Sequence, residues 1–218
     1  MEKPLFPSKT IRITQGYKEG THKDSYAIDN ADKDSGISPI YAPFTGVIKK
    51  IYKQDANEVW LESLEPVEYS DGTKDYLNIL FAHADNVDNL FVGKIIKKGE
   101  IFYKEGTKGN ASGNHCHIEC GRGKFTGTGW HKNNSGYWSI NDGIAPESCL
   151  WVDESINILN DYGYKFKKIP TTSVEKEEVD EEISEEKTPP ITKLTFTAPK
   201  TALYGVYLNK DDILKIES

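Results

Sequence analysis

The sequence predicts a mainly β fold, a small antiparallel β-sandwich or barrel whose loops form a cleft. Short apolar stretches are broken by Gly, Pro, Asn and Asp every eight to twelve residues, which is typical of strands joined by turns. A turn that feeds a strand, at residues 42–48, and a hairpin-like segment with two glycines, at residues 91–101, form a pair that recurs in small β-sandwich barrels. The 218 residues, of which 37% are hydrophobic, are enough for one ordinary core and a small appendage.

Seven segments are strand candidates, because each is a short apolar or alternating run bounded by turn residues. In chain order they are Ile11–Thr14, Tyr26–Asp29, Gly46–Tyr52, Glu58–Glu62, Asn78–Ala82, Ile101–Tyr103 and His115–Glu119. One stretch favours a helix, Asp153–Tyr162, which follows a proline and precedes Gly163.

The charge pattern divides the chain into three parts. Residues 173–187 hold eight acids and two lysines and so carry most of the net charge of −7. A run of like charge with few apolar residues cannot bury enough surface to offset its ordering entropy. We therefore expect a main domain over residues 1–169, an acidic linker flanked by prolines over 170–190, and a short β-like tail over 191–218. A specific acidic docking motif is the alternative for the linker.

Composition excludes several classes of protein. The longest apolar runs have four residues, whereas a membrane span needs roughly 20, so no membrane insertion is expected. The N-terminus lacks the apolar segment of a signal peptide, and three cysteines argue against a disulfide framework, so synthesis in the cytoplasm is expected. The negative net charge argues against a broadly basic nucleic-acid binder.

The histidines carry the chemistry. On a strand, His115 and His117 face the same side, about 7 Å apart, whereas Cys116 faces the core. His22 and Asp29 flank another strand, and a carboxylate after mostly apolar residues is costly unless it is paired or binds a metal. Two imidazoles and a carboxylate suit a catalytic Zn²⁺, whose fourth position stays open for water. Strand geometry leaves open which of His115 and His117 would bind the metal.

Two further histidines have competing interpretations. His83 closes an apolar strand and is either a core residue or a proton carrier beside the metal. His131 lies in the aromatic loop 129–138, which is either an anchored surface loop or a wall of the substrate cleft. We do not expect His131 to be catalytic.

Five motifs occur in an order that resembles the peptidoglycan-cleaving zinc endopeptidases of the lysostaphin and LytM type. They are Gly20-Thr21-His22 with Asp29, Ala42-Pro43-Phe44-Thr45-Gly46-Val47, Phe81-Ala82-His83, Val92-Gly93 with Lys98-Gly99-Glu100, and Gly106 through Gly113-Asn114-His115-Cys116-His117-Ile118-Glu119. The resemblance covers roughly residues 10–120 and implies the lysostaphin-like fold, also called the duplicated hybrid motif.

The resemblance also implies roles for single residues. It makes His22, Asp29 and His117 the Zn²⁺ ligands, and His83 and His115 the catalytic pair. The family's first motif is usually His-x-x-x-Asp, whereas six residues separate His22 from Asp29 here, so the extra length must loop out. Asp24 is a rival ligand for this reason, although it lacks the apolar context of Asp29. Two further departures, Asn114 for the usual Pro and Cys116 for the usual Leu, are compatible with the strand.

The implied activity is zinc-dependent hydrolysis of a peptide bond in bacterial cell-wall peptidoglycan. Without a signal peptide, such an enzyme is expected to act as a phage endolysin in host lysis or as a virion component, and the tail as a wall-binding or homo-oligomerising segment. The alternatives are a catalytically inactive relative with a structural or wall-binding role in a phage, a sugar-phosphotransfer carrier, and a binding module with a structural metal. The sequence does not indicate which peptide bond is cut.

Overall fold

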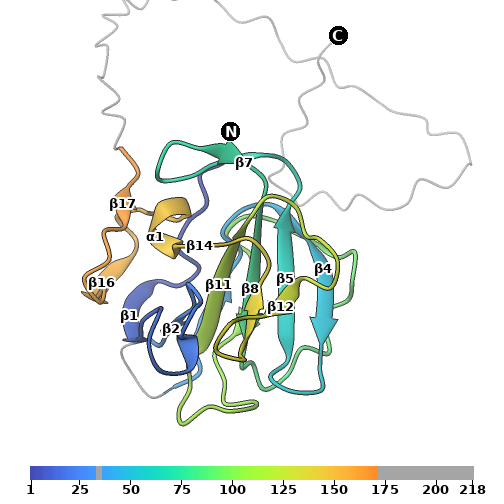
Figure 1. The fold of residues 1–218 in the computed structure, drawn as a ribbon. Coiled ribbons are helices and arrows are strands. Elements are labelled where there is room, and N and C mark those ends of the chain that lie inside the picture. Colours follow the sequence, from blue (N-terminus) through green and yellow to red (C-terminus); the bar gives the residue numbers. More distant parts are fainter. Residues whose placement is uncertain (33–35, 171–218) are drawn as a thin grey trace, which may run out of the picture. The chain divides into compact units, whose positions relative to one another are not determined.

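The computed structural model describes residues 1–32 and 36–170. These residues form a mainly β fold (Figure 1), which confirms the predicted fold class. Helical structure in the described part is limited to the short 3-10 turn η1 (Gly20–His22) and the helix α1 (Pro146–Cys149). None of the helices described has the length and apolarity that a membrane crossing requires.

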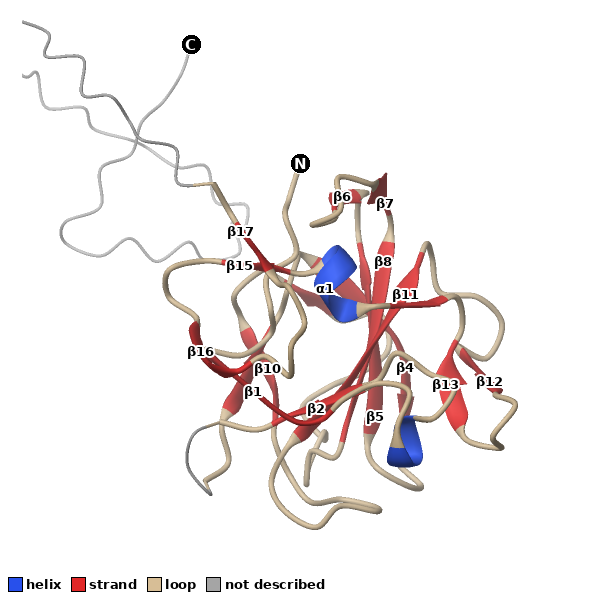
Figure 2. Ribbon diagram, turned by 60° about the vertical axis from the view of Figure 1, so that its left-hand side comes forward, coloured by secondary structure: helices blue, strands red, loops and turns tan. Residues whose placement is uncertain are grey.

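One large sheet organises the domain (Figures 1 and 2). Its strands are β1 (Thr10–Gln15), β2 (Ile28–Asn30), β4 (Gly46–Tyr52), β5 (Glu58–Ser63), β8 (Leu77–Ala82), β9 (Ile95–Ile96), β11 (Cys116–Arg122), β14 (Gly143–Ile144) and β16 (Asn157–Asn160). They lie in the order β16-β1-β2-β11-β8-β5-β4-β9, and β14 pairs with β11 off this path. Each pair in this sheet is antiparallel except β1 with β16, which run parallel.

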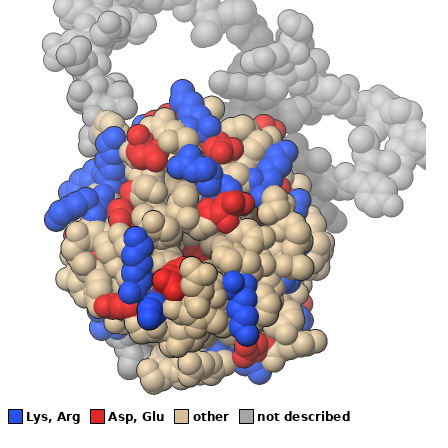
Figure 3. Space-filling model, viewed as in Figure 1, with Lys and Arg blue, Asp and Glu red and all other residues tan. Residues whose placement is uncertain are grey.

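The described chain also contains four two-stranded sheets. They pair β3 (Pro39–Tyr41) with β10 (Ile101–Lys104), β6 (Val67–Glu68) with β7 (Lys74–Asp75), β12 (Trp130–Lys132) with β13 (Trp138–Ile140), and β15 (Trp151–Val152) with β17 (Lys167–Lys168). Basic and acidic side chains are interspersed on the face of the domain in Figure 3, so this face presents no patch of a single sign.

Side-chain alternation along the central strands separates two faces of the large sheet. On β11, Cys116, Ile118 and Cys120 have no exposed surface and join the main core, as predicted. Residues of β3 and β10 belong to the same core, so that small sheet packs against this face. His117 and Glu119 alternate with the core residues and therefore point to the opposite face.

The opposite face is only partly covered. Trp60 on β5, Leu80 on β8 and Ile140 on β13 form a second buried cluster, against which Trp130 packs. The hairpin of β12 and β13 therefore covers this face over β5 and β8. The part nearer β2 stays open, and the predicted site residues lie there.

All seven predicted strands overlap strands of the structure, and Gly46–Tyr52 matches β4 at both ends. The last one begins one residue later than predicted, at Cys116. His115 precedes the strand and makes an isolated bridge with Gly106. His115 and His117 therefore do not continue one regular strand, although both reach the same site.

The predicted helix over Asp153–Tyr162 is wrong. The Asp153 carboxylate accepts hydrogen bonds from the backbone N–H and the hydroxyl of Ser155, which closes a turn where the helix would begin. The chain then forms the edge strand β16 beside β1, and the Asn160 side chain donates to the Ile13 carbonyl at 2.8 Å. Turn formation by Asp and sheet pairing thus override the local helical tendency.

The predicted hairpin over residues 91–101 is also wrong in its pairing. Gly93 and Gly99 do occupy turns with φ of 90° and 79°. The strands beside them pair elsewhere, because β9 joins β4 and β10 joins β3. This segment therefore connects the large sheet to the small one. The predicted linker, from residue 171 on, and the predicted tail lie outside the described residues.

Candidate metal centre

Separate segments bring the five predicted site residues together on the open face of the sheet. Asp29 on β2 lies directly opposite His117 on β11 in antiparallel register. On the other side of β11, β8 ends one residue before His83. His22 comes from η1, and His115 immediately precedes β11. Strand pairing thus explains why residues up to about ninety positions apart meet, as in the 88-residue separation between Asp29 and His117.

The Asp29 carboxylate lies at the centre of the group. Its Oδ1 atom is 3.1 Å from His117 Nδ1, 3.3 Å from His22 Nε2 and 3.6 Å from His115 Nε2. The rings of His83 and His115 are 4.5 Å apart between centroids. Three imidazole nitrogens therefore surround one carboxylate oxygen, with a fourth ring beside them.

Backbone carbonyls orient three of the four rings through Nδ1. The pairs are His22 with Gly16 at 3.0 Å, His83 with Lys108 at 2.8 Å, and His115 with Gly113 at 2.8 Å. A carbonyl only accepts hydrogen bonds, so each Nδ1 must carry the hydrogen. The Nε2 atom of each neutral ring is then left with its lone pair for the site.

His117 is oriented the other way round, by Glu119. His117 Nε2 donates to Glu119 Oε1 at 3.1 Å, which leaves Nδ1 facing Asp29. The second Glu119 oxygen accepts the backbone N–H of Ile140 at 3.0 Å, and only 3% of the Glu119 surface is exposed. Sequence reasoning assigned Glu119 no role. The signal was available, because Glu119 lies two positions after His117 on the same strand face.

Burial and hydrogen bonding together set the charges in the group. Burial alone would raise the pKa of Asp29, but hydrogen bonds from His117 and His22 outweigh it and hold that pKa below its usual range. Burial alone would lower the pKa of His117, but hydrogen bonds to Asp29 and Glu119 raise it to about 10. Burial and the nearby charge of His117 lower the pKa of His83 to about 4. Asp29 is thus ionised and His83 is neutral near pH 7, and a metal ion bound at His117 Nδ1 would replace the proton that this nitrogen shares with Asp29.

The backbone at His83 is strained. Its φ of 85° lies in the left-handed region that non-glycine residues rarely adopt. Its N–H donates to the Ala56 carbonyl at 2.8 Å and its carbonyl accepts from the Lys108 N–H at 3.0 Å, which holds the turn in place. Gly106 packs so close that a Cβ there would overlap the His83 carbonyl oxygen. The surrounding backbone therefore maintains the strain, as is common at functional sites.

The donor atoms fit a zinc ion. Two overlapping sets have their ligand atoms within 4.8 Å of one another, namely His22, Asp29 and His117, and Asp29, His83 and His115. Tetrahedral Zn²⁺ with bonds of about 2.0 Å keeps its ligand atoms about 3.3 Å apart. In the first set, the Asp29 oxygen is 3.3 and 3.1 Å from its partners, whereas in the second it is 3.6 Å from His115. The first set therefore matches this spacing more closely.

Asp24 lies outside both ligand sets. It is exposed, with φ of 59°, in the turn that takes up the extra length between His22 and Asp29. Its carboxylate accepts a hydrogen bond from the Ser135 hydroxyl at 2.5 Å. Asp24 thus ties the loop that carries His22 to the aromatic loop.

A cleft of about 230 Å³ opens beside the ligand sets. Four of the predicted site residues line this cleft, namely His22, Asp29, His83 and His117. Trp130, Tyr137 and Trp138 of the aromatic loop line it as well, as the cleft-wall interpretation predicts. A larger cavity of about 440 Å³, lined by residues between 37 and 105, contains none of the predicted site residues. Chemistry rather than volume therefore singles out the smaller cleft.

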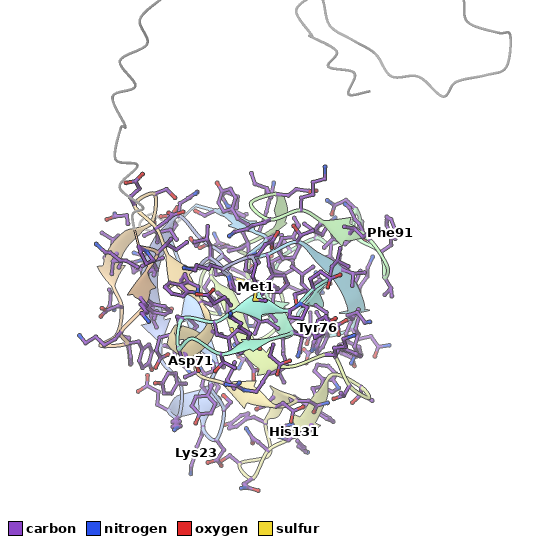
Figure 4. The ribbon with its side chains drawn as sticks, turned by 90° about the horizontal axis from the view of Figure 1, so that it is seen from above. Met1, Lys23, Asp71, Tyr76, Phe91 and His131 are labelled. Atoms are coloured by element: carbon purple, nitrogen blue, oxygen red, sulfur yellow. The ribbon has the colours of Figure 1, made fainter. Side chains whose placement is uncertain are left out.

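The aromatic loop is both anchored and exposed. Trp130 packs edge-on against buried Trp60, with ring centroids 5.0 Å apart, and Trp60 Nε1 donates to the Gly129 carbonyl. Trp138 lies 5.2 Å from Trp130 and is 57% exposed. His131 lies outside both ligand sets, and its Nδ1 contacts the Asn141 side chain at 3.2 Å. Lys23 and His131, from the two loops, lie toward the same edge of the domain in Figure 4.

Comparison with known proteins returns a phage protein and lysostaphin-type peptidases. No sequence profile of a protein family matches the chain. Morphogenesis protein 1 of Bacillus phage B103 is 31% identical over an alignment of 175 residues, and the match covers 74% of this chain and 43% of that protein, so the chain spans less than half of this relative.

Among solved structures, LytU is 21% identical with a TM-score of 0.43, and the match covers 63% of this chain and 82% of LytU. The catalytic domain of the antimicrobial peptidase lysostaphin from Staphylococcus simulans is 19% identical with a TM-score of 0.41, and the match covers 62% and 89% of the two chains.

Proposed function

We propose that this protein is a zinc-dependent endopeptidase that hydrolyses a peptide bond of bacterial peptidoglycan. The observation that carries the proposal is the Asp29 carboxylate surrounded by three imidazole nitrogens, in rings whose other nitrogen is held by a hydrogen bond. The order of the lysostaphin-type motifs supports the same activity. The cleft beside this group is lined by aromatic side chains, which offer a contact surface for a peptide.

The ligands in this proposal are His22, Asp29 and His117. Two imidazoles and one carboxylate leave a tetrahedral ion one open position, as catalytic zinc sites do. When bound there, Zn²⁺ supplies Lewis acidity toward the scissile carbonyl and makes a coordinated water more acidic. Glu119 and the Gly16 carbonyl hold the ligand rings in the orientation that this requires.

His83 and His115 are the proposed catalytic pair. Because each ring donates from Nδ1 to a carbonyl, Nε2 is the atom that gains or loses a proton. A neutral ring accepts a proton from the attacking water at Nε2, and a protonated ring donates there to the negative charge that develops on the carbonyl oxygen. The two rings stand next to each other, so one performs each task.

The test combines metal content with lysis. We expect about one zinc per chain, and a loss of turbidity of purified Gram-positive walls that a chelator stops and Zn²⁺ restores. His83→Ala and His115→Ala should retain zinc and lower the rate about 10²- to 10⁴-fold, because each removes a proton-transfer group. His131→Ala is the matched control and should behave as wild type.

Two results would contradict the proposal. Protein without zinc affinity would refute the ligand assignment. Zinc-loaded protein that releases no peptide fragments from any wall type would instead favour the inactive relative. Mass spectrometry of released fragments identifies the bond.

The name of the phage relative supports a role in the phage particle over release as a free endolysin. That relative is called a morphogenesis protein. We therefore propose that this protein is carried on a virion and acts on the wall during infection. Mass spectrometry of purified particles should detect the chain, whereas detection only in the free lysate would favour the endolysin.

A further inference from the structure

The segment that follows β16 returns to the loop that carries His22. We define residues 160–164 as the strap. It is a tight turn, in which the Tyr162 N–H donates to the Asn160 side chain and the Tyr164 N–H donates to the Asp161 carbonyl. Asn160 also donates to the Ile13 carbonyl of β1, which fixes the start of the strap to the large sheet. These hydrogen bonds therefore fix the turn that carries Tyr162 and Tyr164.

Tyr164 holds the backbone at Tyr17. Its hydroxyl oxygen accepts the Tyr17 N–H at 3.0 Å. The two rings are stacked at 4.3 Å between centroids, with an angle of 9° between their planes. Tyr17 is further fixed by its own hydroxyl, which donates to Glu147 at 2.8 Å.

Tyr162 holds the same loop through Glu19. Its hydroxyl donates to Glu19 Oε1, and this oxygen also accepts the Gly16 N–H at 3.1 Å. A Cβ at Gly16 would overlap the Tyr164 hydroxyl and the Tyr162 ring. The strap therefore fits the loop without a gap, and only glycine allows this approach.

The loop segment 16–19 that the strap holds is the segment that orients His22. The Gly16 carbonyl accepts the His22 Nδ1–H at 3.0 Å, so the position of this carbonyl sets the direction of His22 Nε2. The His22 backbone exchanges hydrogen bonds with the same segment, to the Glu19 carbonyl at 2.7 Å and from the Lys18 N–H at 3.1 Å. Only 3% of the His22 surface is exposed, so solvent hardly competes with these hydrogen bonds.

We propose that Tyr162 and Tyr164 are positioning residues for His22, which act through the Gly16 carbonyl and thereby set the metal affinity of the site. The inference rests on the proposed function only in taking His22 as a metal ligand. Partners that orient a ligand from outside the coordination sphere commonly change metal affinity by about 10- to 100-fold. The strap lies some forty residues beyond the last motif of the family resemblance, so the motifs themselves do not imply this role.

The test measures zinc affinity of the full chain by competition with a chromogenic chelator. Tyr164→Phe keeps the stacked ring and removes the acceptor of the Tyr17 N–H, and Tyr162→Phe removes the donor to Glu19. Each should weaken zinc binding, by about tenfold for Tyr164→Phe. Tyr69→Phe is the matched control, because it also removes a hydrogen-bonded tyrosine hydroxyl, here the donor to the Tyr76 carbonyl, in a part of the chain without site residues. It should lower thermal stability and leave zinc affinity unchanged.

A second measurement does not depend on zinc. The imidazole region of a ¹⁵N–¹H spectrum of metal-free protein should show a His22 Nδ1–H signal that shifts or broadens in Tyr164→Phe and stays in place in Tyr69→Phe. Unchanged zinc affinity and an unchanged His22 signal in both strap variants would overturn the inference and leave the proposed function intact. Wild-type protein that binds no zinc would overturn both. If Tyr69→Phe weakened zinc binding as much as the strap variants do, the strap would only stabilise the fold in general, and the inference would be overturned.

Discussion

Single hydrogen bonds decide which nitrogen of each imidazole is available for chemistry. Four histidines meet at Asp29, and each uses one ring nitrogen for a fixed hydrogen bond. Three of these bonds go to backbone carbonyls and one goes to the buried carboxylate of Glu119. The rings are therefore oriented before any ion binds, which reduces the ordering cost of binding.

Glu119→Gln tests this orientation at the scale of one residue. The change keeps the shape of the side chain but removes the negative charge that His117 Nε2 faces at 3.1 Å. We expect about tenfold weaker zinc binding, because the ligand ring becomes less basic and less well oriented. Chelator competition measures the dissociation constant.

Glu62→Gln is the control for this prediction. Glu62 is also buried, and it accepts the Phe125 N–H as Glu119 accepts that of Ile140, but it pairs with Lys49 rather than with a histidine. A similar loss of zinc affinity in both variants would show that a buried charge, rather than the contact with His117, is responsible.

The hairpin of β12 and β13 acts as a wall at the scale of one element. Asn133 donates to the Lys23 carbonyl at 2.9 Å and Ser135 donates to Asp24, so the hairpin is tied to the loop that carries His22. The buried Trp60 ring packs against Trp130 of this hairpin. The two hydrogen bonds therefore connect the hairpin to the loop of a proposed metal ligand on the other side of the cleft.

Trp138→Ala tests the wall. This side chain is 57% exposed and lines the cleft, so its loss should weaken substrate binding and leave the metal ligands in place. We expect KM for soluble wall fragments to rise roughly three- to tenfold, the equivalent of an aromatic contact of about 0.5–1.5 kcal/mol, with zinc content unchanged. Phe91→Ala is the control, because Phe91 is 62% exposed and lies well away from His131 in Figure 4. A fall in kcat without a change in KM would argue against a substrate-binding wall.

The stability of the whole domain should depend on pH through Glu105. This side chain is only 1% exposed and accepts the backbone N–H groups of Asp32 and Ser38 at 2.9 and 3.3 Å. Burial raises its pKa from the ordinary 4.5 to about 7. The folded state then binds a proton more tightly than the unfolded state, so the free energy of unfolding falls as pH rises from about 4.5 to 7 and is level above that.

Glu105→Gln isolates this contribution, because glutamine does not ionise. Between pH 5 and pH 8 the wild type should lose stability relative to the variant, by at most about 3 kcal/mol. Denaturant unfolding at both pH values measures the difference. Parallel pH profiles of the two proteins would show that Glu105 titrates normally in the folded state.

Much of the architecture and of the site is local in origin. Alternation of apolar residues and the turn residues between them predict each of the seven strands, because burying one sheet face requires a period of two. The spacing of His115 and His117, and the cost of burying Asp29, predict a group of ligands. These are properties of the side chains themselves, and the order of the motifs adds the separate roles expected of each histidine.

Tertiary structure alone decided the rest. The segment 153–162 became a turn and an edge strand because β1 offered an unpaired edge. The carbonyls of Gly16, Lys108 and Gly113 orient the histidines through atoms that every residue has, so no side-chain identity marks them. Tyr162 and Tyr164 reach the His22 loop from more than 140 positions away. The sequence by itself determined which chemical groups are present and how each strand alternates, whereas the path of the folded chain decided which backbone atoms hold those groups in place, because that path depends on pairings between distant segments.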